Sequence, residues 1–367
     1  MKRYIRIIIY LMILIMISNL ISCTNTSGQQ SLPTSKNESL SSSQIQSQLS
    51  SESSILNISG KGDLWTDKKL KVAYISPGAA GNWYIPLKKD FENAAHDWNI
   101  QLYNYDAAGK IEAQEGYIIE LVEKGIDVIA ISPVCLPGWN EEVFETAKKN
   151  DIPIIFINLS AYIRDDLWTS YIVNNWQKEG EMTGEWLIDY LEKKSKLDEE
   201  INIVELIGIK GQYSAQDWSK GFKETIEENE KIKIVESVEG DYTQHKGYEE
   251  MANILSETTD IDVLFCHNDE MALGAIKAIE EAGLVPGEDI IIISIMGTNA
   301  ALEAIVEGKI ACSVECNPFM GDLFMEACVR IANGEEIERE IHPVDRVFDI
   351  TNAQVELDAR AKNGYGY

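Results

Sequence analysis

Residues 128–157, VIAISPVCLPGWNEEVFETAKKNDIPIIFI, decide the fold class of this chain. An apolar run at Val128–Ser132 precedes turn residues and an amphipathic segment at Trp139–Asn150, and a second apolar run follows at Ile154–Ile157. Short, fully apolar runs joined by an amphipathic segment are typical of buried parallel strands connected by a crossover helix. The stretch therefore predicts a βαβ unit.

The same alternation continues on both sides of this stretch. On the N-terminal side it predicts strands at Lys71–Ser76 and Gln101–Tyr105 and helices at Tyr84–Trp98 and Glu112–Lys124. A second series follows, with predicted strands at Ile201–Leu206, Ile232–Ser237, Val263–Cys266 and Ile290–Ile295 and helices at Gln177–Lys194, Ala215–Asn229, Gln244–Glu257 and Glu270–Ala282. One open sheet this wide is unusual, so we expect an α/β fold with two doubly wound, Rossmann-like lobes.

The N-terminal segment indicates export. A basic start precedes an apolar run at Ile7–Ile17, and the segment ends in Leu20-Ile21-Ser22-Cys23. This run is shorter than the roughly 20 residues that span a membrane, and the small residue before cysteine is typical of a lipoprotein signal. We expect a signal peptide at 1–22, a lipidated Cys23, a flexible Ser-rich tether at 23–68 and a protein on the extracellular face of the membrane. The alternative is a retained N-terminal anchor helix.

Charge and cysteine content exclude other classes. The formal net charge of −28 argues against nucleic-acid partners, which need basic surfaces. Apart from Cys23 the cysteines are odd in number and form no CxxC pair, so we expect buried core residues and no disulfide framework. They are Cys135, Cys266, Cys312, Cys316 and Cys328.

Catalytic and metal-binding motifs are missing from the sequence. There is no HExxH, GxSxG or Walker loop, and the four histidines are scattered, with His267 expected to support the site and not to bind metal. Asp269 and Glu315 are the only carboxylates we could nominate as a glycosidase pair. We expect no enzyme, no cofactor and no metal. The sequence contains no DxDxDG-like run, but calcium binding stays undecided.

Loops that follow the predicted strands carry the candidate site. In doubly wound sheets ligands bind beyond the carboxyl ends of the strands, and two facing lobes would line one cleft. These loops are rich in Trp, Tyr, Asn, Asp and Gly. Aromatic rings stack on the apolar faces of sugars while amides and carboxylates bind hydroxyls, so the loops favour a sugar ligand.

Several of these stretches resemble type I periplasmic solute-binding proteins of the ribose-binding superfamily, above all their galactofuranose-binding branch. The matching stretches are Val72-Ala73-Tyr74, Asn82-Trp83, Ser132-Pro133-Val134, Pro137-Gly138-Trp139, Glu179-Gly180, Gly184-Glu185-Trp186-Leu187, Lys220-Gly221-Phe222, Gly240-Asp241-Tyr242-Thr243 and His267-Asn268-Asp269-Glu270-Met271. The resemblance covers nearly everything from Lys71 to Pro343.

The resemblance implies a three-segment hinge and a mechanism. The hinge crossings would fall near Val173–Asn175, Glu315–Pro318 and Glu338–Ile341. The N-terminal lobe would then comprise 69–173 and 317–338, and the C-terminal lobe 174–316 and 339–367. A monomer would close around its solute and present it to an ABC permease with its ATPase, without chemistry.

The sequence departs from the galactofuranose-binding pattern in its polar residues. Positions where that branch has three arginines and two aspartates hold Tyr84, Asn158-Leu159, Trp218 and Met296. This exchange removes charge-assisted hydrogen bonds worth about 1.5–3 kcal/mol each. We therefore expect a stacking cleft for a short oligosaccharide, for example a β-linked gluco-oligosaccharide.

The predicted ligand-binding residues come from the loops described above. They are Trp83, Tyr84, Asp106, Trp139, Asn158, Trp176, Tyr213, Trp218, Asn268, Asp269, Met296 and Glu315. Some have structural alternatives: Asp106 could cap a turn, Trp139 could fasten its loop to the lobe, and either Asn268 or Asp269 could cap the following helix.

Two other functions fit the same sequence. The protein could present its closed form to a receptor kinase as a sensor. It could also transport a quaternary amine, which an aromatic, acidic cleft holds by cation–π contacts.

Overall fold

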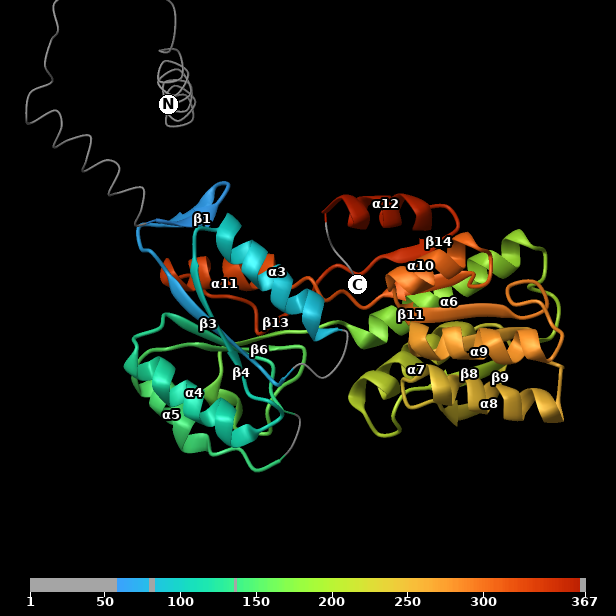
Figure 1. Ribbon diagram of the computed structural model, residues 1–367, viewed down its shortest axis with the longest axis horizontal. Coiled ribbons are helices and arrows are strands. Elements are labelled where there is room, and N and C mark those ends of the chain that lie inside the picture. The colour runs from blue at the N-terminus through green and yellow to red at the C-terminus, as the bar shows by residue number, and fades with distance from the viewer. Residues whose placement is uncertain (1–57, 79–82, 135–136, 364–367) are drawn as a thin grey trace, which may run out of the picture. The chain divides into compact units, whose positions relative to one another are not determined.

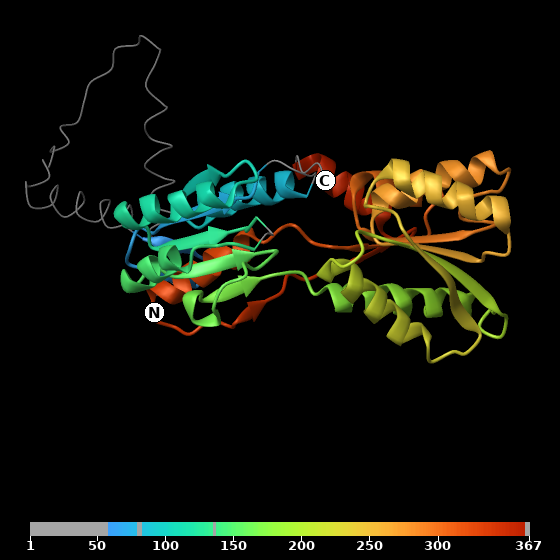
Figure 2. The same cartoon turned by 90° about the horizontal axis from the view of Figure 1, so that it is seen from below.

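A computed structural model describes residues 58–78, 83–134 and 137–363 of the chain. It contains two six-stranded sheets, each covered by helices on both faces, which confirms the predicted α/β fold with two doubly wound lobes (Figures 1 and 2). The predicted signal peptide, Cys23 and Cys135 lie outside the described residues.

The first sheet is entirely parallel. In spatial order its strands are β13 (Glu340–Ile341), β7 (Ser170–Ile172), β6 (Ile154–Ile157), β5 (Val128–Ile131), β3 (Lys71–Ser76) and β4 (Gln101–Asp106). Helices α3 (Tyr84–Asp97) and α11 (Gly321–Ala332) cover one face, and α4 (Ile111–Glu123) and α5 (Glu141–Lys149) cover the other (Figure 1). A 3-10 turn, η1 (Asp165–Leu167), precedes β7.

Strand β3 explains why this sheet lies between two helical layers. Val72 and Tyr74 belong to the core on the α3–α11 side, whereas Ala73 and Ile75 belong to the core on the α4–α5 side. Successive side chains of a strand point to opposite faces, so a continuous apolar run requires cover on both.

The second sheet is parallel except for its last strand. In spatial order its strands are β14 (Val347–Asp349), β12 (Cys312–Glu315), β11 (Ile291–Met296), β10 (Val263–Cys266), β8 (Ile201–Ile207) and β9 (Ile232–Glu239), and β14 runs antiparallel to β12. Figure 2 shows the green pair α6 (Trp176–Lys193) and α7 (Tyr213–Ile226) on one face and the yellow-orange pair α8 (Gln244–Glu257) and α9 (Asp269–Glu281) on the other. Helices α10 (Asn299–Val306) and α12 (Ala353–Asn363) contribute to the core on the α8–α9 face.

Two glycines let α6 and α7 pack backbone to backbone. A Cβ atom at Gly180 would lie 2.3 Å from the carbonyl oxygen of Trp218, and one at Gly221 would lie 2.0 Å from that of Gln177. Neither position tolerates a side chain without displacing the other helix. This contact places Trp176, the first residue of α6, near the same end of the lobe as Trp218.

The chain passes between the sheets three times: after β7, after β12 and after β13. The first two crossings fall in the regions where we predicted hinge segments. The third lies at 342–346 and not at Glu338–Ile341, because Glu340 and Ile341 pair with Tyr171 and Ile172 as the edge strand of the first sheet. The predicted boundary at 338 is therefore too early.

A hairpin replaces the end of the predicted tether. Strands β1 (Ser59–Lys61) and β2 (Leu64–Thr66) pair antiparallel. The buried Ser59 hydroxyl donates to the carbonyl of Asn99 at 2.9 Å, and the Gly60 N–H donates to the carbonyl of Trp98 at 2.7 Å. These bonds hold the segment on the first lobe, so a tether that extends to 68 is wrong.

Candidate ligand-binding cavity

A cavity of about 1010 Å³ is lined by residues of both lobes and of the second crossing segment. Its position follows from the topology, because its lining comes mainly from segments that follow the carboxyl ends of strands in both sheets. Eight of the predicted residues line it: Trp83, Tyr84, Asn158, Trp176, Trp218, Asn268, Asp269 and Met296.

The first lobe contributes an aromatic corner. Trp83 lies directly before α3, and its indole Nε1 donates to the carbonyl oxygen of Cys316 at 3.3 Å. Tyr84 packs against it edge to face, with 5.4 Å between the ring centroids. Because Cys316 belongs to the segment that crosses between the lobes, this bond connects the corner to the crossing.

The second lobe contributes Trp218 from inside α7. Only 4% of Trp218 is exposed, and its Nε1 donates to a carboxylate oxygen of Glu179 at 2.6 Å. Trp218 is therefore both a core residue and part of the cavity wall. The His267 ring lies edge-on to the Trp218 ring, with 5.7 Å between the ring centroids, and hydrogen-bonds to Glu205. His267 therefore helps to hold Trp218 in place.

Tyr242 is the aromatic residue of the cavity that the sequence analysis missed. Its ring meets Trp218 edge to face at 6.3 Å, and its hydroxyl lies 3.2 Å from that of Ser214. The ring fits because Gly208 has no side chain: a Cβ atom there would lie 1.9 Å from Cζ of Tyr242. The available signal was its place in the loop after the predicted strand at Ile232–Ser237, within the matching stretch Gly240-Asp241-Tyr242-Thr243.

Other lining residues were also missed. They are polar or apolar neighbours of predicted positions on the same loops and helix starts, namely Ile85, Pro86, Leu159, Gln212, Ser214, Glu270, Thr298, Asn299, Ala300, Glu303 and Cys316. Sequence patterns do not separate them from their neighbours, because the turn in which a helix starts decides which side chains face the cavity.

Two predicted ligand contacts, Asn268 and Asp269, use their polar atoms for hydrogen bonds within the protein. Asn268 caps α9, since its Oδ1 accepts from the Met271 N–H at 2.9 Å while its Nδ2 donates to the carbonyl of Tyr242. Asp269 is fully buried, and its carboxylate accepts from Ser294 at 2.6 Å and from the Thr298 N–H at 2.7 Å. Burial raises the pKa of Asp269. Both residues hold the cavity wall in shape.

Asp106 and Tyr213 do not line the cavity. Asp106 accepts from the Ala108 N–H at 2.8 Å, which is the turn-capping alternative, and it lines a separate hollow of about 370 Å³ that shares Tyr84 and Ile85 with the cavity. Tyr213 is the first residue of α7 and is 60% exposed, whereas its neighbours on both sides line the cavity.

Trp139 and Glu315 are core residues. Trp139 is 7% exposed and packs on Phe144 at 5.6 Å, so it fastens its loop to the lobe. Glu315 is fully buried and forms a two-pronged ion pair with Arg346, at 2.7 Å for each contact. Its charge is already balanced within the protein, and Glu315 does not line the cavity, so the nominated pair of Asp269 and Glu315 does not form there.

Three cavity residues have strained backbone conformations. Asn158, Tyr242 and Met296 have φ values of 66°, 58° and 124°. Such conformations cost side-chain-bearing residues about 1–3 kcal/mol and gather at functional sites.

A buried and a half-buried carboxyl group, those of Glu179 and Asp345, form a pair where the chain crosses between the lobes. Glu179 is fully buried, and burial followed by the charge of Asp345 raises its pKa well above the usual range. Burial also raises the pKa of Asp345 to about 6. The Asp345 carboxylate accepts from the Asn317 N–H at 3.0 Å and from the Asn174 amide at 3.3 Å, so it joins all three crossing segments.

Within the described part of the chain, no group of His, Cys, Asp or Glu side chains has the geometry of a metal site. In the same part, none of the helices combines the length and apolarity needed to cross a bilayer.

The fold and the cavity define a two-lobed binding protein, and the comparisons agree. A sequence model of the periplasmic binding protein domain matches residues 72–336. The galactofuranose-binding protein YtfQ of Escherichia coli is 32% identical over 301 residues, 81% of this chain and 93% of that protein. The ribose import binding protein RbsB of Bacillus subtilis is 28% identical over 71% of this chain and 80% of its own length.

Solved structures give the same assignment. A Mycobacterium smegmatis protein in complex with β-D-fucofuranose is 34% identical, with a TM-score of 0.67 over 80% of this chain and 96% of that chain. The binding component of an arabinose ABC transporter from Shewanella sp. ANA-3, bound to L-arabinofuranose, is 31% identical with a TM-score of 0.69 over 80% and 96%. The chain belongs to the periplasmic binding protein family. Its relatives are binding proteins and not enzymes, which confirms the prediction of a non-enzyme.

Proposed function

We propose that this chain is an extracellular solute-binding lipoprotein that binds a sugar or short oligosaccharide and delivers it to the permease and ATPase of an ABC importer. Cys23 would carry the lipid that keeps the protein at the membrane. The protein would act as a monomer, without a cofactor.

The aromatic cavity carries this proposal. Five rings line it, those of Trp83, Tyr84, Trp176, Trp218 and Tyr242. Aromatic rings offer flat apolar surface to the faces of a sugar ring, while side-chain amides such as that of Asn158 bind hydroxyls. The relatives named for galactofuranose, ribose and arabinose support a sugar as the class of solute.

Size and composition support a ligand longer than one sugar ring. A volume of about 1010 Å³ lies at the upper end of the roughly 300–1,000 Å³ typical of small-molecule pockets. A β-linked gluco-oligosaccharide suits the rings because its equatorial hydroxyls leave both faces of each sugar apolar. Asn158, Trp176 and Met296 would contact it directly, with Trp83 and Trp218 on either side.

Ligand-dependent melting tests the proposal. The full-length protein in mild detergent is heated with monosaccharides and oligosaccharides, and tryptophan fluorescence is followed in parallel. A ligand present at 100 times its Kd stabilises the folded state by about 2.7 kcal/mol, so a bound sugar raises the melting temperature.

Trp176→Ala should weaken sugar binding about tenfold or more, because it removes a stacking surface from the cavity wall. The control is Trp65→Ala: Trp65 lies on β2, is 40% exposed and is not part of the cavity lining. If no sugar raises the melting temperature, or if Trp176→Ala binds like the control, the proposal is wrong.

A further inference from the structure

The charges that line the cavity are all negative. Besides the buried Asp269, the lining contains the carboxylates of Glu270, in the first turn of α9, and Glu303, on α10, and none of the described lining residues is a lysine or an arginine. No ion pair or hydrogen bond links the Glu270 and Glu303 side chains to another described residue.

Lys88 and Lys89 form no ion pair with these carboxylates, and Arg360, which donates to the lining residue Asn299, pairs with Glu315 and Glu356. Lys88 and Lys89 of α3 line the smaller hollow beside Tyr84, and Lys89 lies 3.9 Å from Glu92 on its own helix. Neither lysine belongs to the lining of the large cavity. When a ligand expels water from this cavity, uncompensated carboxylates become costly unless the ligand supplies a positive charge.

The aromatic walls favour the same charge. An ammonium group within about 6 Å of an indole or phenol ring is attracted by roughly 0.5–2 kcal/mol, more when both are out of water. Five aromatic rings line the same cavity as these two carboxylates. Carboxylates and rings are independent features, and both attract a cation.

We infer that the ligand of this cavity is an amino sugar, or an oligosaccharide of amino sugars, whose protonated amine faces Glu270 and Glu303. This inference rests on the proposed function and specifies it. A sugar framework is required because the side-chain amides of Asn158 and Gln212 offer directed hydrogen bonds that a simple quaternary amine does not use. The acidic protein, with its net charge of −28, also attracts cationic ligands over long range.

Matched ligands test the inference with the full-length protein in mild detergent, by calorimetry. The pairs are glucosamine and glucose, galactosamine and galactose, and the β-1,4-linked dimers of glucosamine and of glucose, with N-acetylated forms and choline as further arms. We expect at least one amine to bind about tenfold or more tightly than its neutral partner. N-acetylation should remove the difference, as should raising the pH from 6 to 9, which deprotonates the amine.

Charge-removing variants locate the preference. Glu303→Gln and Glu270→Gln should each weaken binding of the amine about threefold or more, and should change the Kd of the matched neutral sugar by a smaller factor. The control is Glu257→Gln, which removes an exposed charge of α8 outside the cavity lining.

The outcomes separate the inference from the proposed function. Equal affinity for amines and neutral sugars, or a preference that survives both glutamate substitutions and the rise in pH, overturns the amino-sugar inference and leaves sugar binding intact. Binding of choline without binding of any carbohydrate overturns the inference and the proposed function together, and so does the absence of binding in every arm.

Discussion

At the residue scale, Asp345 shows how burial couples protonation to folding. Its pKa is raised to about 6 by burial, whereas an aspartate in an unfolded chain has a pKa of about 3.9. The folded protein therefore binds more protons than the unfolded chain between about pH 4 and 6, and its stability falls as the pH rises through this window. Burial also raises the pKa of Asp90 to about 6, and it raises the pKa values of Glu179 and Asp269, so these groups change stability with pH in the same direction.

Asp345→Asn should remove the contribution of Asp345 to the pH dependence of the free energy of unfolding. The amide oxygen still accepts from the Asn317 N–H, but no charge forms at high pH. We expect the variant to equal the wild type in stability near pH 4 and to exceed it by about 1–2 kcal/mol at pH 8. Urea unfolding at pH 4, 6 and 8 measures the difference. A difference that does not change with pH would contradict the assigned pKa.

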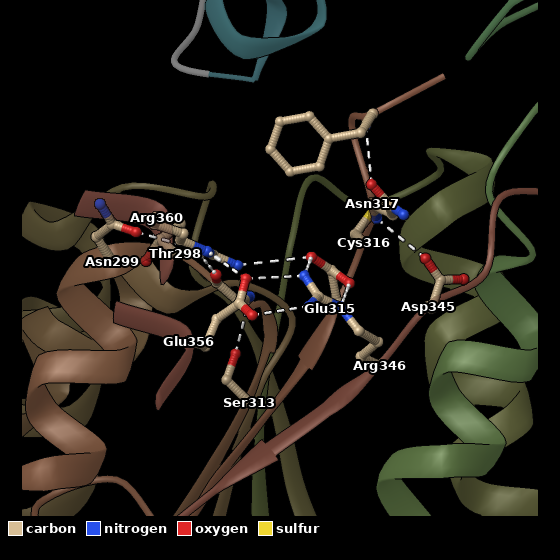
Figure 3. A network of polar contacts seen from close by, with 12 residues as sticks. Thr298, Asn299, Ser313, Glu315, Cys316, Asn317, Asp345, Arg346, Glu356 and Arg360 are labelled. Carbon is tan, nitrogen blue, oxygen red and sulfur yellow. Dashed lines mark hydrogen bonds and ion pairs between the residues drawn. The ribbon is translucent and has the colours of Figure 1, made fainter. Parts of the chain in front are cut away.

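At the element scale, helix α12 holds a cavity loop in place from outside the matched family region. Arg360 of α12 is 3% exposed and donates to the carbonyl of Gly297 at 2.7 Å and to the side chain of Asn299 at 3.0 Å. Figure 3 shows Arg360 and Arg346 with the carboxylates of Glu315 and Glu356 in one network. This network fastens α12 to β12 and to the loop before α10.

Arg360→Met should therefore affect both stability and binding. The substitution leaves the Gly297 carbonyl without its donor, so we expect a loss of about 2–4 kcal/mol in the free energy of unfolding. Ligand affinity should fall as well, because Thr298 and Asn299 line the cavity. Chemical unfolding and calorimetry measure the two effects.

The control for this substitution is Arg164→Met. The Arg164 side chain is 51% exposed and pairs with Glu141 and Glu145 on α5. Exposed ion pairs contribute little, so a loss below about 1 kcal/mol is expected. If the two variants lose the same stability, the network around Arg360 has no special structural role.

At the scale of the whole molecule, membrane attachment is proposed to depend on one residue. Acyl chains on Cys23 would contribute about 0.8 kcal/mol for each buried CH₂ group, enough to hold an otherwise acidic protein at the bilayer surface. Cys23→Ser should move the protein from the membrane fraction to the medium in a bacterial host that processes lipoproteins. Immunoblots of the two fractions measure this, with Ser42→Ala in the tether as the control. Retention of Cys23→Ser at the membrane would indicate an anchor helix instead.

The regular elements were predictable because local patterns encode them. Strand β10 and helix α8 begin and end at the residues that the sequence predicts, Val263–Cys266 and Gln244–Glu257. The hairpin β1–β2 was not predictable from the sequence, because its three-residue strands are held by Asn99 and Trp98, which lie far along the chain. The third crossing between the lobes was predicted too early for the same reason: β13 forms only by pairing with β7, which is distant in the chain.

The sequence by itself determined the two-lobed α/β fold and the loops that carry the cavity, because strand periodicity and loop position are properties of neighbouring residues. Only the tertiary structure decided which polar side chains remain available to contact a ligand. Asp269 and Glu315 look like ligand contacts in the sequence, yet Asp269 accepts hydrogen bonds from Ser294 and Thr298 and Glu315 pairs with Arg346. Glu270 and Glu303 line the cavity, although neither was among the predicted ligand-binding residues. Hydrogen-bond partners distant in the chain cannot be read from local sequence, and they decide this choice.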